Sequence, residues 1–365
     1  MDISKIDKNL KVETEIKEAD IAFYDARRAP FEIYGLYNAK TETRFKRLPD
    51  EIGQNVNEGV AQLYLNTAGG RLRFATDSRY IAIKAEMPGM CAYPHSAFTG
   101  TAGFDLYMND PVTDSSRFIK SYIPDIKATD GYESVIYLPD NKMRYFTVHF
   151  PSYANVTSLY IGLQESATVE EGMKYRPLDP VVYYGSSITQ GGCAMRPGNT
   201  YQAIVSAHMN MDYINLGFSG SGKGEDLIVD YMANLKMSAF VSDYDHNAPT
   251  LEHLEATHCK LYQKIREKHP DIPYIILSKP DFSGCVWPGY TEENVKRRDV
   301  IIDTFRYARE QGDKNVYWID GEGLFRGPYF NSCSVDACHP TDMGFALMAD
   351  AVEHELRVAF TQRWL

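Results

Sequence analysis

The segment PVVYYGSSITQGGCAMRPGNTYQAIVSAHMNMDYINLGF (residues 180–218) decides the fold of the C-terminal half. It opens with an apolar run of strand length, VVYYG (181–185), and then turns through a stretch rich in Gly and Ser. An amphipathic segment of helix length follows near 200–210 and leads into a second apolar run, DYINLGF (212–218). Strand, crossover helix and strand in this order are typical of a parallel sheet.

The same alternation continues to the C-terminus. Three further strands are predicted, at SAFVSDY (238–244), PYIILSK (273–279) and VYWIDG (316–321). Further helices are expected near 225–235, 250–268, 291–311 and 341–359. The pattern therefore predicts a flavodoxin-like, three-layer α/β/α domain around a five-stranded parallel sheet.

The N-terminal half has a different rhythm. Short runs rich in β-branched and aromatic residues are separated by Gly, Pro, Asn and Asp: LRFAT (72–76), YIAIKAEM (80–87), YESVIYLP (132–139), YFTVHF (145–150) and SLYIGL (158–163). No helix is convincing there, so we expect an all-β sandwich or jelly roll. At 365 residues two domains are expected. The charged, Pro-containing stretch 164–180 predicts a division into 1–175 and 176–365.

Composition narrows the class of ligand. The formal net charge is −11, which argues against nucleic acid or an anionic membrane and favours a neutral ligand. Residues 1–20 are charged and lack the apolar core of a signal peptide, and no later run is long enough to span a bilayer, so we expect a cytoplasmic protein. Six scattered cysteines without CxxC spacing fit a reducing compartment. The oligomeric state stays open, a homo-oligomer included.

Candidate catalytic residues follow the first and last strands. Ser187 lies in the Gly-flanked turn GSSITQGG (185–192), where a sharp turn can expose a hydroxyl. The loop DACHPT (336–341) places Asp336 three residues before His339, so the carboxylate could orient the imidazole as a base. Taken alone, Ser187 could be an ordinary turn or cap residue and Asp336 an acid at a helix start.

Two more loops carry donors for an oxyanion. The loop after the second strand, NLGFSGSG (215–222), holds Gly220 among small residues whose backbone N–H groups could face an anion. The loop after the third strand, DYDHNAP (243–249), offers the side-chain amide of Asn247. Gly-rich loops are mostly turns, but four such loops in order supply a nucleophile, two donors and a base at one sheet edge.

This ordered set resembles the four blocks of the SGNH (GDSL-like) hydrolase superfamily. The resemblance implies that Ser187 is the nucleophile, that Asp336 and His339 complete the triad, and that the oxyanion hole comprises Ser187, Gly220 and Asn247. The resemblance spans residues 180–360. It implies an enzyme that needs no cofactor.

Two positions depart from the family pattern, because Ser186 replaces the usual Asp and DHNAP stands where many relatives have GxND. The second departure leaves Asn215 as the next candidate for the amide donor. GFDLY (103–107) is similar to the GxDLY motif, which names the N-terminal region of a bacterial branch of these enzymes.

Such two-domain relatives are often carbohydrate O-acetylesterases. The resemblance therefore implies an acetylated plant oligosaccharide of the mannan or xylan type as the substrate. Candidate substrate-binding residues are aromatic or imidazole side chains in loops, which suit a sugar face: His246, Trp287, Tyr290, Tyr93 and His95.

Two other functions use or resemble the same set of residues. A GDSL lipase or thioesterase would use the same machinery on another acyl group, although no amphipathic lid is evident. A carbohydrate-binding protein with a degenerate hydrolase half is a further alternative, which the intact Ser, Asp and His disfavour. His253, His258 and Cys259 lack the spacing of a zinc site, so no metal is expected. GSGKGED (220–226) does not match a phosphate-binding loop.

Overall fold

The computed structural model describes residues 16–280 and 288–363 and divides into two compact units. The first unit comprises Met1–Arg47, Leu65–Lys174 and Met195–Gly198, and the second comprises Leu48–Tyr64, Tyr175–Ala194 and Asn199–Leu365. The main division after Lys174 lies beside the predicted one at 175/176. Two short segments are assigned across this division, Leu48–Tyr64 to the second unit and Met195–Gly198 to the first, and no sequence pattern predicts them.

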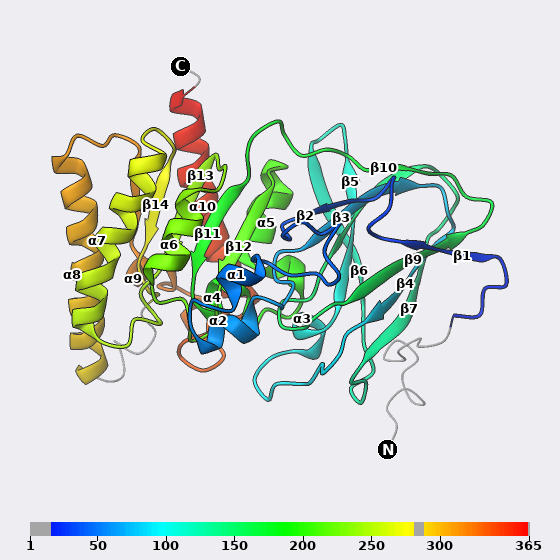
Figure 1. Ribbon diagram of the computed structural model, residues 1–365, viewed down its shortest axis with the longest axis horizontal. Coiled ribbons are helices and arrows are strands. Elements are labelled where there is room, and N and C mark those ends of the chain that lie inside the picture. The colour runs from blue at the N-terminus through cyan, green and yellow to red at the C-terminus, as the bar shows by residue number, and fades with distance from the viewer. Residues whose placement is uncertain (1–15, 281–287, 364–365) are drawn as a thin grey trace. The chain divides into compact units, whose positions relative to one another are not determined.

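The first unit is a β-sandwich, as predicted (Figure 1). One antiparallel sheet has the order β1 (Ile21–Asp25), β9 (Ser158–Gln164), β4 (Tyr80–Glu86) and β7 (Gly131–Tyr137). The other has the order β10 (Val169–Glu171), β3 (Arg71–Thr76), β8 (Arg144–His149), β5 (Phe104–Asp110) and β6 (Ser115–Tyr122), and β2 (Glu32–Tyr34) also pairs with β3. Alternating side chains such as Leu72, Phe74, Phe146 and Val148 fill the core.

The GFDLY stretch leads into β5, whose Asp105 and Tyr107 hydrogen-bond to the Met195–Gly198 segment. The buried Asp105 carboxylate accepts hydrogen bonds from Gly198 N (2.9 Å) and Arg196 Nη1 (3.3 Å). The Tyr107 hydroxyl donates to Gly198 O at 3.2 Å. Gly103 is needed on steric grounds, since a Cβ atom there would lie 2.4 Å from Thr99 O in α3 (Phe98–Thr101). The motif thus binds both the backbone N–H and the backbone carbonyl of Gly198.

The second unit contains the predicted five-stranded parallel sheet, in the order β12-β11-β13-β14-β15. The strands are β11 (Val181–Gly185), β12 (Tyr213–Gly217), β13 (Ala239–Asp243), β14 (Tyr274–Leu277) and β15 (Val316–Ile319). This 2-1-3-4-5 order is that of flavodoxin-like folds, so the fold prediction is confirmed. The order reverses at β11, and the crevice at its carboxyl end is where such folds bind ligands.

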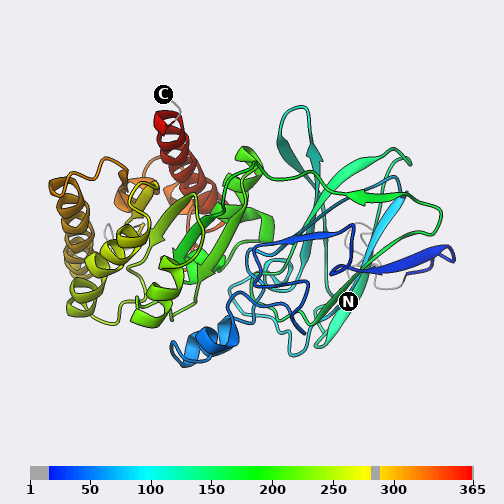
Figure 2. The same cartoon turned by 45° about the horizontal axis from the view of Figure 1, so that its top comes forward.

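Helices cover both faces of this sheet (Figure 2). α5 (Tyr201–Met209) packs against α10 (Asp342–Arg363), while α7 (Leu251–Lys268) packs against α6 (Asp226–Ala233) and α8 (Pro288–Glu310). Short helices α4 (Ser187–Gln190) and α9 (Gly321–Leu324) follow β11 and β15. None of the helices within 16–280 and 288–363 is long and apolar enough to cross a membrane.

Candidate active site

Ser187 is the first residue of α4, directly after the turn that ends β11. The turn is tight, because a Cβ atom on Gly185 would lie 2.2 Å from Thr189 Oγ1 and 2.4 Å from Asp243 O. Ser186 caps the helix through a 3.1 Å hydrogen bond from Ile188 N to its Oγ. Ser and Asp are both good N-cap residues, which explains why Ser186 can stand where relatives have Asp.

The loop after β12 lies against α4. A Cβ atom on Gly217 would approach Gln190 N to 2.2 Å, so only glycine permits this packing. The Gln190 side chain accepts a 2.9 Å hydrogen bond from Ser219 N, next to Gly220. Gly220 is exposed and has φ +65°, a left-handed conformation suited to glycine. The predicted oxyanion loop is therefore tied to the helix that starts at Ser187.

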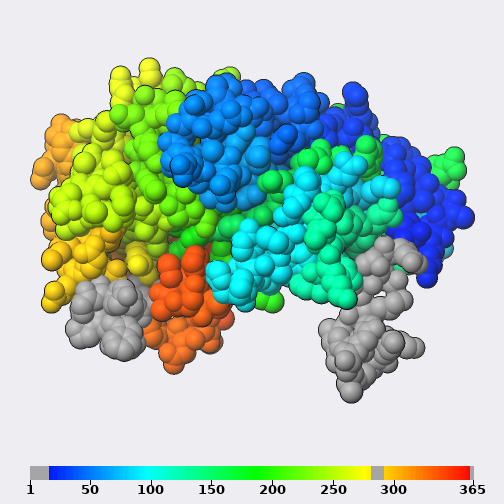
Figure 3. Space-filling model, turned by 60° about the horizontal axis from the view of Figure 1, so that its bottom comes forward, coloured from blue at the N-terminus to red at the C-terminus, as the bar shows by residue number. Residues whose placement is uncertain are grey.

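Asp336 and His339 lie in the surface loop between α9 and α10, which is drawn in orange in Figure 3. Asp336 Oδ1 accepts hydrogen bonds from Cys338 N (3.1 Å) and His339 N (2.7 Å), and its Oδ2 faces His339 Nδ1 at 2.8 Å. Ala337 takes a left-handed φ of +63° within this turn. Burial alone would raise the pKa of Asp336, but these hydrogen bonds and the His339 charge outweigh it and lower the pKa.

The far side of the imidazole reaches Ser187. His339 Nε2 lies 2.9 Å from Ser187 Oγ. The three side chains singled out from the sequence thus form one hydrogen-bonded chain, although Ser187 and His339 are 152 positions apart. In this arrangement Nε2 can take the Ser187 proton while Asp336 stabilises the resulting imidazolium.

Asn247 lies in the loop after β13 and reaches the loop after β12. Its Nδ2 donates a 2.8 Å hydrogen bond to Phe218 O, which leaves the second N–H of the amide for another acceptor. Asn215, the alternative donor, uses its amide differently: Nδ2 donates to Thr189 O and Oδ1 accepts from Gly217 N. Asn215 is also buried, whereas Asn247 is half-buried, and this difference in exposure favours Asn247 over Asn215 as a donor to a ligand.

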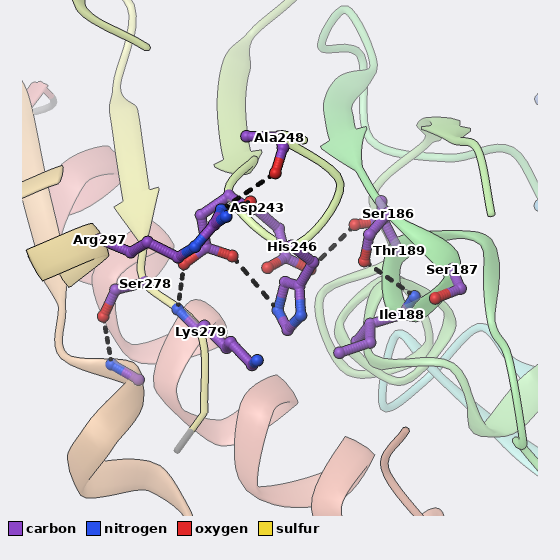
Figure 4. A network of polar contacts seen from close by, with 12 residues as sticks. Ser186, Ser187, Ile188, Thr189, Asp243, His246, Ala248, Ser278, Lys279 and Arg297 are labelled. Carbon is purple, nitrogen blue, oxygen red and sulfur yellow. Dashed lines mark hydrogen bonds and ion pairs between the residues drawn. The ribbon is translucent and has the colours of Figure 1, made fainter. Parts of the chain in front are cut away.

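His246 is nearly buried beside Asn247, with its Nε2 3.5 Å from Asp245 Oδ1. Burial first, and then the charges of Lys279, His339 and Arg297, lower the pKa of His246 well below its ordinary value. A neutral imidazole follows, able to donate or accept a hydrogen bond. In Figure 4, His246 has Lys279 and Arg297 on one side and the Ser186–Thr189 turn on the other. Its role in substrate binding stays a prediction.

The other predicted substrate-binding residues are placed as follows. Trp287 lies outside the described residues, and Tyr290 falls in α8 where the side chain is not described. Tyr93 and His95 are exposed in the first unit, where the Tyr93 ring contacts Tyr153 with centroids 5.9 Å apart. Their roles stay predictions.

Two residues near the site were missed in the sequence. Asn57, between α1 (Asp50–Gly53) and α2 (Glu58–Leu63), donates to Ser221 O at 2.9 Å and so braces the loop of Gly220. Arg297 of α8 binds the loop of Asn247. Neither sits in a motif or at a strand end, so periodicity gives no signal for them.

His253 and His258, whose spacing does not fit a zinc site, form hydrogen bonds within the protein. His253 Nε2 contacts Lys223 O at 2.8 Å, and His258 Nδ1 contacts Thr304 Oγ1 at 2.7 Å. Burial lowers the pKa of His258 to about 4, so its imidazole is neutral near pH 7.

Comparison with known families gives two matches. Residues 178–357 match the GDSL-like lipase/acylhydrolase family, and residues 21–169 match the GxDLY family, described as the N-terminus of SGNH-hydrolase-type esterases. The chain therefore belongs to the GDSL-like (SGNH) hydrolases that carry a GxDLY-type N-terminal region, which makes it an esterase-class hydrolase. A search of curated proteins gives no match.

Solved structures with the same fold cover nearly the whole chain. One from Bacteroides ovatus ATCC 8483, named as a GDSL-like lipase, is 26% identical with a TM-score of 0.82, over 92% of this chain and 98% of that one. The salicylyl-acyltransferase SsfX3 of a tetracycline biosynthetic pathway is 19% identical (TM-score 0.74; 94% and 98% covered). The acetyl xylan esterase Est2A from the rumen bacterium Butyrivibrio proteoclasticus is 11% identical (TM-score 0.58; 93% and 99% covered).

Proposed function

We propose that the chain is a serine esterase that removes O-acetyl groups from plant polysaccharides or their oligosaccharides. The observation that carries the catalytic part is the hydrogen-bonded chain from Ser187 Oγ through both ring nitrogens of His339 to Asp336. A serine hydroxyl is a weak nucleophile by itself, and a neighbouring base oriented by a carboxylate activates it.

The reaction has two halves. Ser187 Oγ attacks the ester carbonyl while His339 Nε2 takes its proton, and the tetrahedral oxyanion is bound by the N–H groups of Ser187 and Gly220 and the amide of Asn247. Collapse breaks the ester C–O bond, and His339 gives the proton to the departing sugar oxygen, which leaves as a hydroxyl. Water, deprotonated by His339, then attacks the acetyl-enzyme, and acetate leaves as Ser187 recovers its proton.

The carbohydrate part rests on the two-unit architecture. A β-sandwich followed by an SGNH fold also occurs in structures named as carbohydrate esterases, over more than nine-tenths of this chain. The net charge of −11 agrees with a neutral polymer better than with a polyanion. Xylan and mannan are the substrate types we propose.

Acetate release tests this proposal. Purified protein is incubated with acetylated xylan, acetylated mannan, acetylated pectin and an aryl ester series from acetate to octanoate, with Ser187→Ala in parallel. We expect acetate from xylan or mannan and a steep fall in kcat/KM beyond the acetyl ester. Equal or better cleavage of octanoate, with no acetate from any polymer, would instead favour the lipase or thioesterase alternative.

A further inference from the structure

The loop that carries Asn247 has little regular structure of its own. It leaves β13 at Asp243 and enters α7 at Leu251, with Thr250 as the helix cap and one turn hydrogen bond, Ala248 N to Asp245 O at 3.2 Å. An amide that stabilises a developing oxyanion must be held within a fraction of an ångström. Contacts from outside the loop must supply this precision.

Arg297 supplies two of these contacts. Its Nη1 donates to Asp245 O at 3.2 Å and to Ala248 O at 3.1 Å, the two carbonyls that flank His246 and Asn247 (Figure 4). The Arg297 side chain is only 15% exposed, and its Nε pairs with Glu293 Oε1 at 2.9 Å one turn earlier in α8. Because Glu293 binds Nε and so fixes the direction of the guanidinium, Nη1 points at both carbonyls at once.

The loop is also attached on its other sides. Asp245 Oδ2 accepts a 2.9 Å hydrogen bond from Lys279 N, just beyond β14. Asn247 Nδ2 itself donates to Phe218 O. Arg297 therefore binds the loop on both sides of the His246–Asn247 pair. Lys279 N and Phe218 O each bind the loop at one position.

We infer that Arg297 is a positioning residue that sets the direction of the Asn247 amide in the oxyanion hole. The inference rests on the proposed function, in which Asn247 is the donor. Without the guanidinium, two carbonyls lose a charged donor and the loop gains freedom. Arg297 binds both carbonyls through Nη1 while its Nε binds Glu293, and the single nitrogen of lysine cannot take both positions, so lysine can replace only part of this role.

The test is a double-mutant cycle between Arg297 and Asn247, measured as kcat and KM on an aryl acetate. We expect Arg297→Ala to lower kcat about tenfold with KM within about twofold, and Arg297→Lys to restore part of the loss. In the Asn247→Ala background, Arg297→Ala should cost nothing more. Arg298→Ala is the matched control, because Arg298 lies next in α8 but pairs with Asp320 and Glu322.

Hydrogen exchange of residues 244–250 gives a readout independent of activity. Exchange there should be faster in Arg297→Ala and unchanged in Arg298→Ala. Additive losses of kcat in the double variant, or an unchanged kcat in Arg297→Ala while Asn247→Ala is impaired, would overturn the positioning role alone. Full activity of Asn247→Ala would contradict both the positioning role of Arg297 and the role of Asn247 in the oxyanion hole. In that case, loss of activity in Ser187→Ala would still support the proposed esterase function.

Discussion

The Thr189 hydroxyl donates a 2.9 Å hydrogen bond to Asp243 Oδ2, which joins the helix of Ser187 to the end of the neighbouring strand. Asp243 is fully buried, and its Oδ1 has no hydrogen-bond partner among the described residues. Burial first, and then the charge of Asp245, raise the pKa of Asp243 well above its ordinary value. Burial therefore favours the neutral, protonated form of Asp243 more in the folded chain than in the unfolded one.

This shift predicts a pH dependence of stability. A carboxyl group whose pKa is higher folded than unfolded stabilises fully below the unfolded value of 3.8, and the stabilisation is lost as the pH rises through the folded pKa. Asp243→Asn should therefore gain free energy of unfolding relative to the wild type between pH 4 and pH 8. Urea unfolding at several pH values measures this, with the exposed Asp303→Asn as control. If the free energies of unfolding of the wild type and Asp243→Asn changed with pH in parallel, the raised pKa of Asp243 would be contradicted.

Gly217→Ala should destabilise the second unit by about 3 kcal/mol, in the range of overpacked cores. The new Cβ atom would meet the backbone nitrogen of Gln190 at 2.2 Å, and backbone cannot swing away as a side chain can. Thermal unfolding measures the loss. Gly323→Ala is the matched control, since a Cβ atom there meets nothing within 4 Å. Similar melting temperatures for the two variants would show that the β12 and α4 packing is looser than described.

The GxDLY contacts predict an effect on stability. Tyr107→Phe removes the donor to Gly198 O and should cost about 1 kcal/mol, the usual net value of a hydrogen bond. Tyr145→Phe, on β8 of the same sheet, should cost less, because its hydroxyl has no hydrogen bond among the described residues. Chemical denaturation of both variants decides the point, and equal losses would speak against a specific role for the motif tyrosine.

Asn247→Ala should lower kcat by roughly 10²- to 10³-fold with little change in KM, because an oxyanion donor acts mainly in the transition state. Steady-state kinetics on an aryl acetate give both values. Asn234→Ala, an exposed amide at the end of α6, serves as control. A rise in KM alone would instead place Asn247 in substrate binding.

The sequence predicted the parts of the fold that follow from local periodicity. All five parallel strands were found, because each is an apolar run bounded by loop residues, and the residues after β11 and β15 were singled out because strand ends meet at one sheet edge. Strands β1, β2, β5, β6 and β10 were missed. Strands β1, β2, β6 and β10 are only partly buried and their hydrophobic pattern is weak, whereas β5 is mostly buried but was singled out only for its GFDLY motif.

Long-range partnerships of residues outside the recognised motifs could not be predicted. Asn57 contacts Ser221 across 164 positions, and Arg297 reaches Asp245 across 52, so their roles depend on tertiary packing rather than on spacing. The Met195–Gly198 segment likewise belongs to the first unit because it contacts Asp105 and Tyr107 of a strand distant in sequence. A single sequence contains the residues but not these pairings.

The central claim is that Ser187 is the nucleophile, and initial rates of aryl acetate hydrolysis by Ser187→Ala test it most directly. The matched control is Ser238→Ala, which removes from the same unit a buried hydroxyl that has no hydrogen-bond partner within residues 16–280 and 288–363. We predict wild-type rates for Ser238→Ala and a loss of several orders of magnitude for Ser187→Ala, with unchanged circular dichroism. Retention of more than about a tenth of the wild-type turnover by folded Ser187→Ala would contradict the account.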